Sequence, residues 1–122
     1  MTIPIYLISF NRLTWLKQLA EQCQKFPDST VVIVDNASTY PPLVDWLRQC
    51  PHDVVRLTEN LGHRSPWRSN VIQPAAAQEA RWGTPYYAVS DHDLSLEGVP
   101  ADALAVLCEG LVKWPQTIKA GL

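Results

Sequence analysis

The sequence of 122 residues lacks any long hydrophobic run and any cluster of positive charge. Its apolar runs are only a handful of residues long, whereas a membrane-spanning helix needs roughly 20. Lysine and arginine number 10 against 12 acidic residues, so the net charge is -2 and no basic patch for a nucleic-acid backbone is visible. We therefore expect no membrane span and no nucleic-acid partner.

Cysteine is also scarce, and Cys23, Cys50 and Cys108 are widely separated. No C-x-x-C pair occurs, so the sequence offers neither a readable zinc site nor a redox motif. We expect the three thiols to act as small hydrophobic side chains in a reducing compartment. The first residues lack the basic and apolar regions that are typical of a signal peptide, and we expect a cytoplasmic protein.

Several nucleotide-binding and hydrolase motifs are missing as well. The sequence has five glycines and contains no G-x-G-x-x-G, no P-loop and no G-x-S-x-G elbow. These absences argue against dinucleotide-dependent enzymes, kinase-type NTPases and α/β-hydrolases.

Short apolar runs alternate with amphipathic stretches along the chain. The runs predict strands near 3–8, 31–34, 54–58 and 86–90, with a further strand starting near 117–120. Helical spacing covers 13–23 and 43–49, Pro74 divides a third helical region, and Pro100 opens a last helix. This alternation predicts one α/β domain over residues 1–122, Rossmann-like, with a mainly parallel sheet and helices on both faces.

Polar clusters follow four of the predicted strands, at residues 9–12, 35–39, 59–64 and 91–93. Because the carboxyl ends of parallel strands lie along one edge of the sheet, the four clusters should share a single rim. Open α/β sheets bind their ligands at this rim. The placement of the clusters therefore predicts one polar binding site.

Asp91 and Asp93 are the strongest candidates for chemistry. In an extended chain, side chains two residues apart point to the same side, so both carboxylates can face one cation. Mg²⁺ and Mn²⁺ prefer such oxygens and keep positions open for a diphosphate. The alternative is a turn in which the aspartates bind their own backbone. His92 should point the opposite way, and we expect it to be structural or on the surface.

Other residues of the predicted rim allow two readings each. Asp35 ends the second strand and either binds a nucleobase or ribose or caps a turn. Asn11 either contacts the ligand or caps the first helix. Arg64 follows the flexible Gly62 and either grips phosphate bidentately or is an ordinary surface arginine.

Four segments together resemble the amino-terminal, nucleotide-sugar-binding part of family 2-type glycosyltransferases of the GT-A fold. They occur in the order of that family, cover nearly the whole chain, and comprise residues 4–12 (PIYLISFNR), 32–40 (VIVDNASTY), 59–62 (ENLG) and 89–94 (VSDHDL). The combination of Val-Asp-Asn-Ala-Ser-Thr with a downstream Asp-x-Asp is the more specific part of the resemblance.

The resemblance implies a donor site for a nucleoside-diphosphate sugar, with Mn²⁺ or Mg²⁺ as cofactor and glycosyl transfer to a hydroxyl as the parent chemistry. Ser9 to Arg12 would border the nucleobase, Asp35 would hold the base or ribose, and Arg64 would lie toward the diphosphate. The implied nucleotide-sugar contacts are Ser9, Asn11, Arg12, Asp35, Asn36, Asn60, Arg64 and Asp91, and the implied metal ligands are Asp91 and Asp93.

In that family the acceptor site and the catalytic base lie in a second half, which these 122 residues do not show. We therefore assign no catalytic residue and expect a homodimer or a partner chain to supply the acceptor site. A dimer contact is predicted around Val112, Trp114 and Ile118. Two alternatives stay open: a non-catalytic module that binds nucleotides or nucleotide sugars, and a structural α/β domain that binds a partner.

Overall fold

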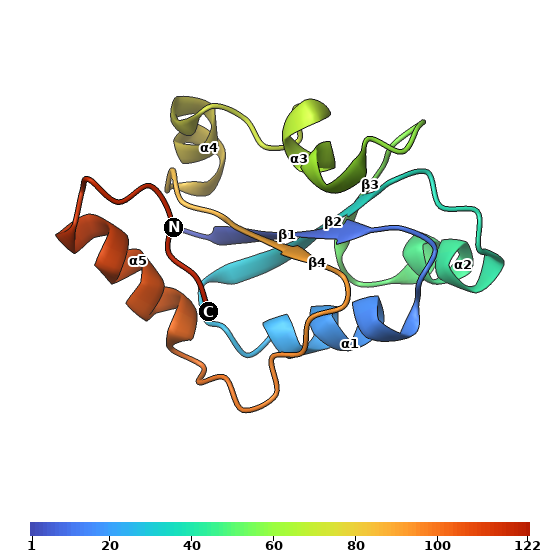
Figure 1. The fold of residues 1–122 in the computed structure, drawn as a ribbon, viewed down its shortest axis with the longest axis horizontal. Coiled ribbons are helices and arrows are strands. Elements are labelled where there is room, and N and C mark those ends of the chain that lie inside the picture. Colours follow the sequence, from blue (N-terminus) through green and yellow to red (C-terminus); the bar gives the residue numbers. More distant parts are fainter.

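Four parallel strands form the sheet at the centre of the molecule, which the computed structural model describes from Met1 to Leu122 (Figure 1). The strands are β1 (Ile3–Ser9), β2 (Ser29–Asp35), β3 (Asp53–Arg56) and β4 (Ala88–Asp91). Their order across the sheet is β3-β2-β1-β4, and every neighbouring pair is parallel. The predicted α/β fold with a parallel sheet is confirmed.

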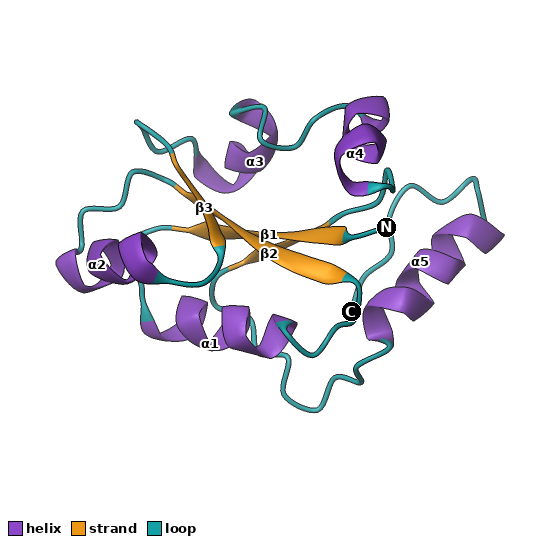
Figure 2. Cartoon of the chain, turned by 180° about the vertical axis from the view of Figure 1, so that it is seen from behind, coloured by secondary structure: helices purple, strands orange, loops and turns teal.

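Helices cover both faces of this sheet (Figures 1 and 2). One face carries α1 (Thr14–Cys23) and α2 (Pro41–Gln49), and α5 (Ala103–Lys113) lies on the same side beyond β4. The other face carries the short 3-10 helix η1 (Gly62–Arg64), α3 (Ser65–Arg68) and α4 (Ala75–Trp82). The predicted break between two helical pieces is present: Pro74 directly precedes α4, and α3 ends earlier, at Arg68, before Asn70 with its positive φ of 60°. None of these helices is long and apolar enough to cross a membrane.

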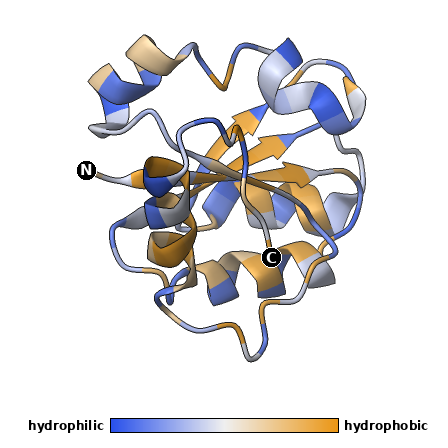
Figure 3. Ribbon diagram, turned by 60° about the vertical axis from the view of Figure 1, so that its left-hand side comes forward, coloured by the Kyte–Doolittle hydropathy of each residue, from blue (hydrophilic) through white to orange (hydrophobic).

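The two central strands are buried on both faces, and their alternation divides the core in two. Ile5, Leu7 and Ile33 belong to a cluster of 13 buried residues against α1 and α2. Tyr6 and Val32 belong to a second cluster of only 4 buried residues on the opposite face. Figure 3 shows these strands as the most continuous apolar segments of the chain. The side with α1 and α2 therefore carries most of the hydrophobic stabilisation.

The fifth strand predicted near 117–120 is not formed, so this prediction was wrong. The segment after α5 has no regular structure, and its last backbone hydrogen bond runs from Thr117 N to the Trp114 carbonyl at 2.9 Å. Ile118 and Leu122 are both strongly exposed. β-branched and apolar residues predict a strand only when a neighbouring strand supplies hydrogen bonds, and none pairs with this segment.

The thiols behave as predicted for small hydrophobic side chains. Cys23 lies in the larger core cluster, where burial raises the pKa of its thiol to about 11. Burial also raises the pKa of the Cys108 thiol. All three cysteines are free.

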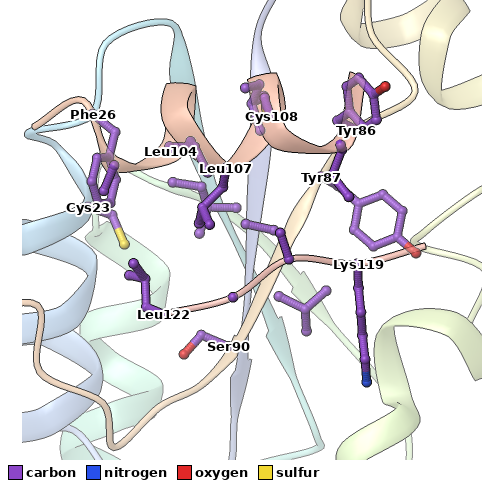
Figure 4. Close-up of a pocket in the computed structure, with 18 of the residues that line it drawn as sticks. Cys23, Phe26, Tyr86, Tyr87, Ser90, Leu104, Leu107, Cys108, Lys119 and Leu122 are labelled. Atoms are coloured by element: carbon purple, nitrogen blue, oxygen red, sulfur yellow. The ribbon is translucent and has the colours of Figure 1, made fainter. Parts of the chain in front are cut away.

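An apolar groove of about 700 Å³ separates α5 from the sheet (Figure 4). Leu104 and Leu107 point from α5 into the space between Cys23 and Tyr87. Ala103 is the only buried residue of α5, and Val112 (65% exposed) and Trp114 (50% exposed), which directly follows the helix, face solvent. The helix thus carries apolar side chains on both sides, a pattern that is typical of a helix covered by a further layer.

Self-association stays a prediction, and the exposed side of α5 supplies its test. We expect Val112→Glu to shift a dimer toward monomer in light scattering across a dilution series, because a carboxylate cannot be buried unpaired in an interface. Glu109→Gln on the same helix is the matched control and should leave the size unchanged. A wild-type chain that stays monomeric at high micromolar concentration would contradict the prediction.

Candidate functional site at the carboxyl rim of the sheet

The order of the strands defines where the rim opens. The chain runs outward from β1 to β2 and β3, and then returns to place β4 on the other side of β1. The direction of winding therefore reverses between β1 and β4, which is the point where open α/β sheets form a binding crevice. The loop from Ser9 to Arg12 and the turn from Asp91 to Asp93 lie on the two sides of this point.

Asp35 is the centre of a buried hydrogen-bond network at the end of β2. Its side chain is fully buried, and one carboxylate oxygen, Oδ1, accepts from the hydroxyls of Ser9 at 2.9 Å and Ser38 at 2.6 Å. The other oxygen, Oδ2, accepts from the Ser38 backbone N–H at 3.0 Å and from Arg56 Nε at 3.3 Å. The carboxylate thus has four protein donors, which is the number it can ordinarily accept.

This network ties three strands together. Ser9 ends β1, Asp35 ends β2 and Arg56 ends β3, and the three are neighbours in the register of the sheet. Arg56 also donates from Nη2 to the Ser38 carbonyl at 2.7 Å. The capping role that the sequence allowed for Asp35 is therefore present, while its contact with a base or ribose stays a prediction.

The three asparagines that were predicted to contact the ligand also make hydrogen bonds within the protein. Asn11 Oδ1 accepts from the backbone N–H groups of Thr39 and Tyr40 at 2.8 and 3.0 Å, so it holds the entrance of α2 rather than capping α1. Asn36 Oδ1 accepts from Leu61 N at 3.2 Å, and Asn36 Nδ2 donates to the Gly62 carbonyl at 3.1 Å. Asn60 Oδ1 accepts from Gly62 N at 2.8 Å. These amides fix the loops around the rim.

Four of the predicted charged side chains are different, because they are exposed and have no side-chain partner in the protein. They are Arg12, Arg64, Asp91 and Asp93. Arg12 follows β1, Arg64 ends η1, which comes after β3 in the chain, and the two aspartates lie at the end of β4. The predicted site residues thus divide into an internal set that builds the rim and an exposed charged set that is free to meet a ligand.

The Asp91–Asp93 segment leaves the sheet at its edge. Asp91 is the last residue of β4 and pairs with Ile8, and His92 and Asp93 form the turn that follows. His92 is half-buried, with Nδ1 at 3.2 Å from the Ile8 carbonyl oxygen, which is the structural one of the two positions expected for it. No group of three or more His, Cys, Asp or Glu side chains is placed to hold a metal ion. A cation at this turn would therefore need further oxygens from a substrate or water.

Sequence reasoning missed Arg56 as part of the rim. Its position at the end of a strand, opposite an aspartate in the register, was the available signal, but the register was not known before the structure. Ser38 lies in the predicted polar cluster 35–39, but its bond to Asp35 was not predicted. Both residues matter because they neutralise or bind the buried Asp35 carboxylate.

Comparison with known proteins supports the fold. No family model and no curated protein matches the sequence. Among solved structures, the crystal structure of S. aureus TarS, a glycosyltransferase, is similar with a TM-score of 0.52 and 18% sequence identity. The match covers 89% of this chain and 20% of TarS, so the chain spans about a fifth of the length of that protein. The similarity shows a shared fold over most of this chain.

The network predicts that Asp35 contributes strongly to stability. We expect Asp35→Ala to lower the free energy of unfolding by about 1.5–3 kcal/mol, because it removes charge-assisted hydrogen bonds and leaves buried hydroxyls without an acceptor. Urea denaturation followed by circular dichroism measures this change.

The matched control is Asp45→Ala, which removes an exposed aspartate that lies 3.6 Å from Arg48 on α2. Exposed pairs of this kind contribute at most about 1 kcal/mol. Equal urea midpoints of unfolding for the wild type and Asp35→Ala would show that the network adds nothing to stability. The same variant, assayed where it is folded, reports whether Asp35 also contacts a nucleotide.

Proposed function

We propose that the carboxyl rim binds a nucleoside-diphosphate sugar together with Mn²⁺ or Mg²⁺, and that the chain is the donor-binding part of a glycosyltransferase. The observation that carries the proposal is the pair of exposed, unpartnered carboxylates at Asp91 and Asp93, beside the point where the winding of the sheet reverses. The similarity in fold to TarS and the resemblance of the sequence segments point the same way.

The donor set fits a hard divalent cation that is shared with a substrate. Two carboxylates without a lysine or arginine partner supply oxygens, and no third protein ligand completes a closed cage. Mg²⁺ in particular is commonly held by one or two carboxylates together with substrate phosphates and waters. When bound, the cation would neutralise charge on the departing nucleoside diphosphate.

The exposed arginines bring positive charge to the rim. Arg64 ends η1 and Arg68 ends α3, which packs against β1, and Arg68 Nη1 donates to the Leu61 carbonyl at 3.2 Å, whereas Asp91 and Asp93 lie at the end of β4. A guanidinium binds phosphate oxygens through parallel N–H groups. We assign the arginines to direct phosphate contacts and the aspartates to contacts through the cation.

The internal set acts by holding the backbone of the rim in place. Asn36 fixes the loop at Leu61 and Gly62, two residues before Arg64, and Asn11 fixes the loop that carries Arg12. A rim that is ordered before the ligand arrives loses less conformational entropy on binding. These residues therefore support binding even where their own polar atoms contact only protein.

We assign no catalytic base. Asp102 precedes α5, and Glu109 lines a second cavity together with Met1 and Asp28, at the amino ends of β1 and β2. Glu109 therefore lies at the opposite end of the sheet from the rim. The position of Glu109 therefore favours a module that binds the nucleotide sugar without turning it over. Turnover assays with a sugar acceptor distinguish an enzyme from such a binding module.

The metal assignment predicts a cation-dependent stabilisation by nucleotide. UDP with Mn²⁺ should raise the melting temperature more than UDP alone, since a ligand at 100 times its dissociation constant stabilises the fold by about 2.7 kcal/mol. For a domain of this size that corresponds to a rise on the order of 10 °C. Differential scanning calorimetry with and without Mn²⁺ measures the difference.

Asp93→Asn should remove the Mn²⁺-dependent part of the rise and leave the melting temperature of the free protein unchanged. Glu97→Gln, an exposed carboxylate four positions further along the chain, is the matched control and should keep the full response. If Asp93→Asn responds to Mn²⁺ and UDP as the wild type does, the metal does not bind at this turn.

A further inference from the structure

The side chain of His92 occupies the position where the pairing of β1 and β4 ends. Ile8 and Asp91 are the last pair in the register of these two strands. Beyond them the backbone of β4 enters the turn, and the next link to β1 is the contact of His92 Nδ1 with the Ile8 carbonyl oxygen at 3.2 Å. The imidazole therefore bridges the two strands at the point where the winding reverses.

The geometry identifies Nδ1 as the ring nitrogen that bonds the Ile8 carbonyl. A carbonyl oxygen only accepts hydrogen bonds, so Nδ1 carries the proton in this contact. The other nitrogen, Nε2, is buried and has no hydrogen-bond partner. A buried Nε2 cannot reach a cation at the exposed rim without rotation of the ring, which argues against His92 as a third metal ligand.

The segment on the far side of the turn is anchored separately. Leu96 is buried, its backbone N–H donates to Gln22 Oε1 at 2.6 Å, and Lys25 Nζ donates to the carbonyls of Leu96 and Val99 at 2.6 and 2.9 Å. The turn is thus tied to α1 after Asp93 and to β1 through Asp91. Of His92, Asp93 and Leu94 in between, only His92 makes a side-chain hydrogen bond to another part of the chain.

From this arrangement we infer that His92 is a positioning residue, which holds the Asp91–Asp93 turn against β1 so that both carboxylates are placed before a cation arrives. The inference rests on the proposed function for the role of the carboxylates. The contact with Ile8 orders the turn whether or not a ligand is present. Partners that act one shell away from a metal typically change its affinity about 10- to 100-fold when they are removed.

Three substitutions separate the hydrogen bond from the ring. His92→Asn places an amide N–H close to the position of Nδ1, so it should keep the bond to Ile8. His92→Gln places its amide near the position of Nε2, and His92→Leu has no donor. Circular dichroism and melting without ligand establish that each variant is folded.

The first measurement is Mn²⁺ affinity in the presence of UDP, by electron paramagnetic resonance of free Mn²⁺. We expect His92→Asn to stay within about 3-fold of the wild type, and His92→Gln and His92→Leu to lose about 10-fold or more. UDP affinity without metal should not change. Wild-type affinity in His92→Leu overturns the inference, and a loss in His92→Asn as large as in His92→Leu would show that the ring, rather than the bond to Ile8, is needed.

The second measurement needs no ligand. Amide hydrogen exchange at His92, Asp93 and Leu94 should be faster in His92→Leu than in the wild type, and unchanged in His92→Asn. If the wild type binds no Mn²⁺ with UDP, the proposed function fails, and exchange still decides whether His92 orders the turn. Equal exchange in all variants overturns the positioning role.

Discussion

The buried carboxylate of Asp35 is the interaction on which the architecture of the rim depends. A buried charge is costly unless hydrogen bonds and an opposite charge compensate it. Here the compensation comes from the ends of three different segments: the hydroxyl of Ser9 on β1, the loop at Ser38, and the guanidinium of Arg56 on β3. The Asp35 carboxylate can therefore be buried only when these three segments have their final register. The same hydrogen bonds fix the strand ends from which the rim loops begin.

The exposed charged side chains are attached to the backbone that this network and the rim amides fix. Arg12, Arg64, Asp91 and Asp93 lie in or beside rim segments whose backbone is held by amides or, at the acidic turn, by an imidazole. Side chains that are hydrogen-bonded within the protein fix the backbone of the rim. Side chains without a partner in the protein are available to bind a ligand. The proposed donor site needs both groups, although only the second would touch the cation or the phosphates.

Much of the fold could be predicted from the sequence, because the evidence for it is local. Period and composition located the four strands to within a few residues, and Pro74 located the break between α3 and α4. The rule for parallel sheets then placed the polar clusters on one rim. The failed strand near residue 118 shows the limit, since strand formation requires a partner that local composition does not reveal.

The functions of individual rim residues were harder to predict, because they depend on contacts between distant segments. The roles of Asp35, Asn11 and Asn36 follow from bonds to residues about 20 to 30 positions away, apart from the bonds of Asp35 to its neighbour Ser38. A sequence motif marks such residues as special without saying whether a ligand or another loop receives their hydrogen bonds. Arg56 was overlooked for the same reason.

The return of the chain to β1 has a consequence for the order in which the rim assembles during folding. Ser9 and Asp35 meet across 26 positions of the chain, whereas Ile8 and His92 meet across 84. The longer closure costs about 1 kcal/mol more in chain entropy, and it joins an edge strand that is only partly buried to a core that β1, α1 and β2 already form. The acidic turn is therefore expected to be the last part of the rim to take its place, so that a nascent domain would position Arg12 and Arg64 before Asp91 and Asp93.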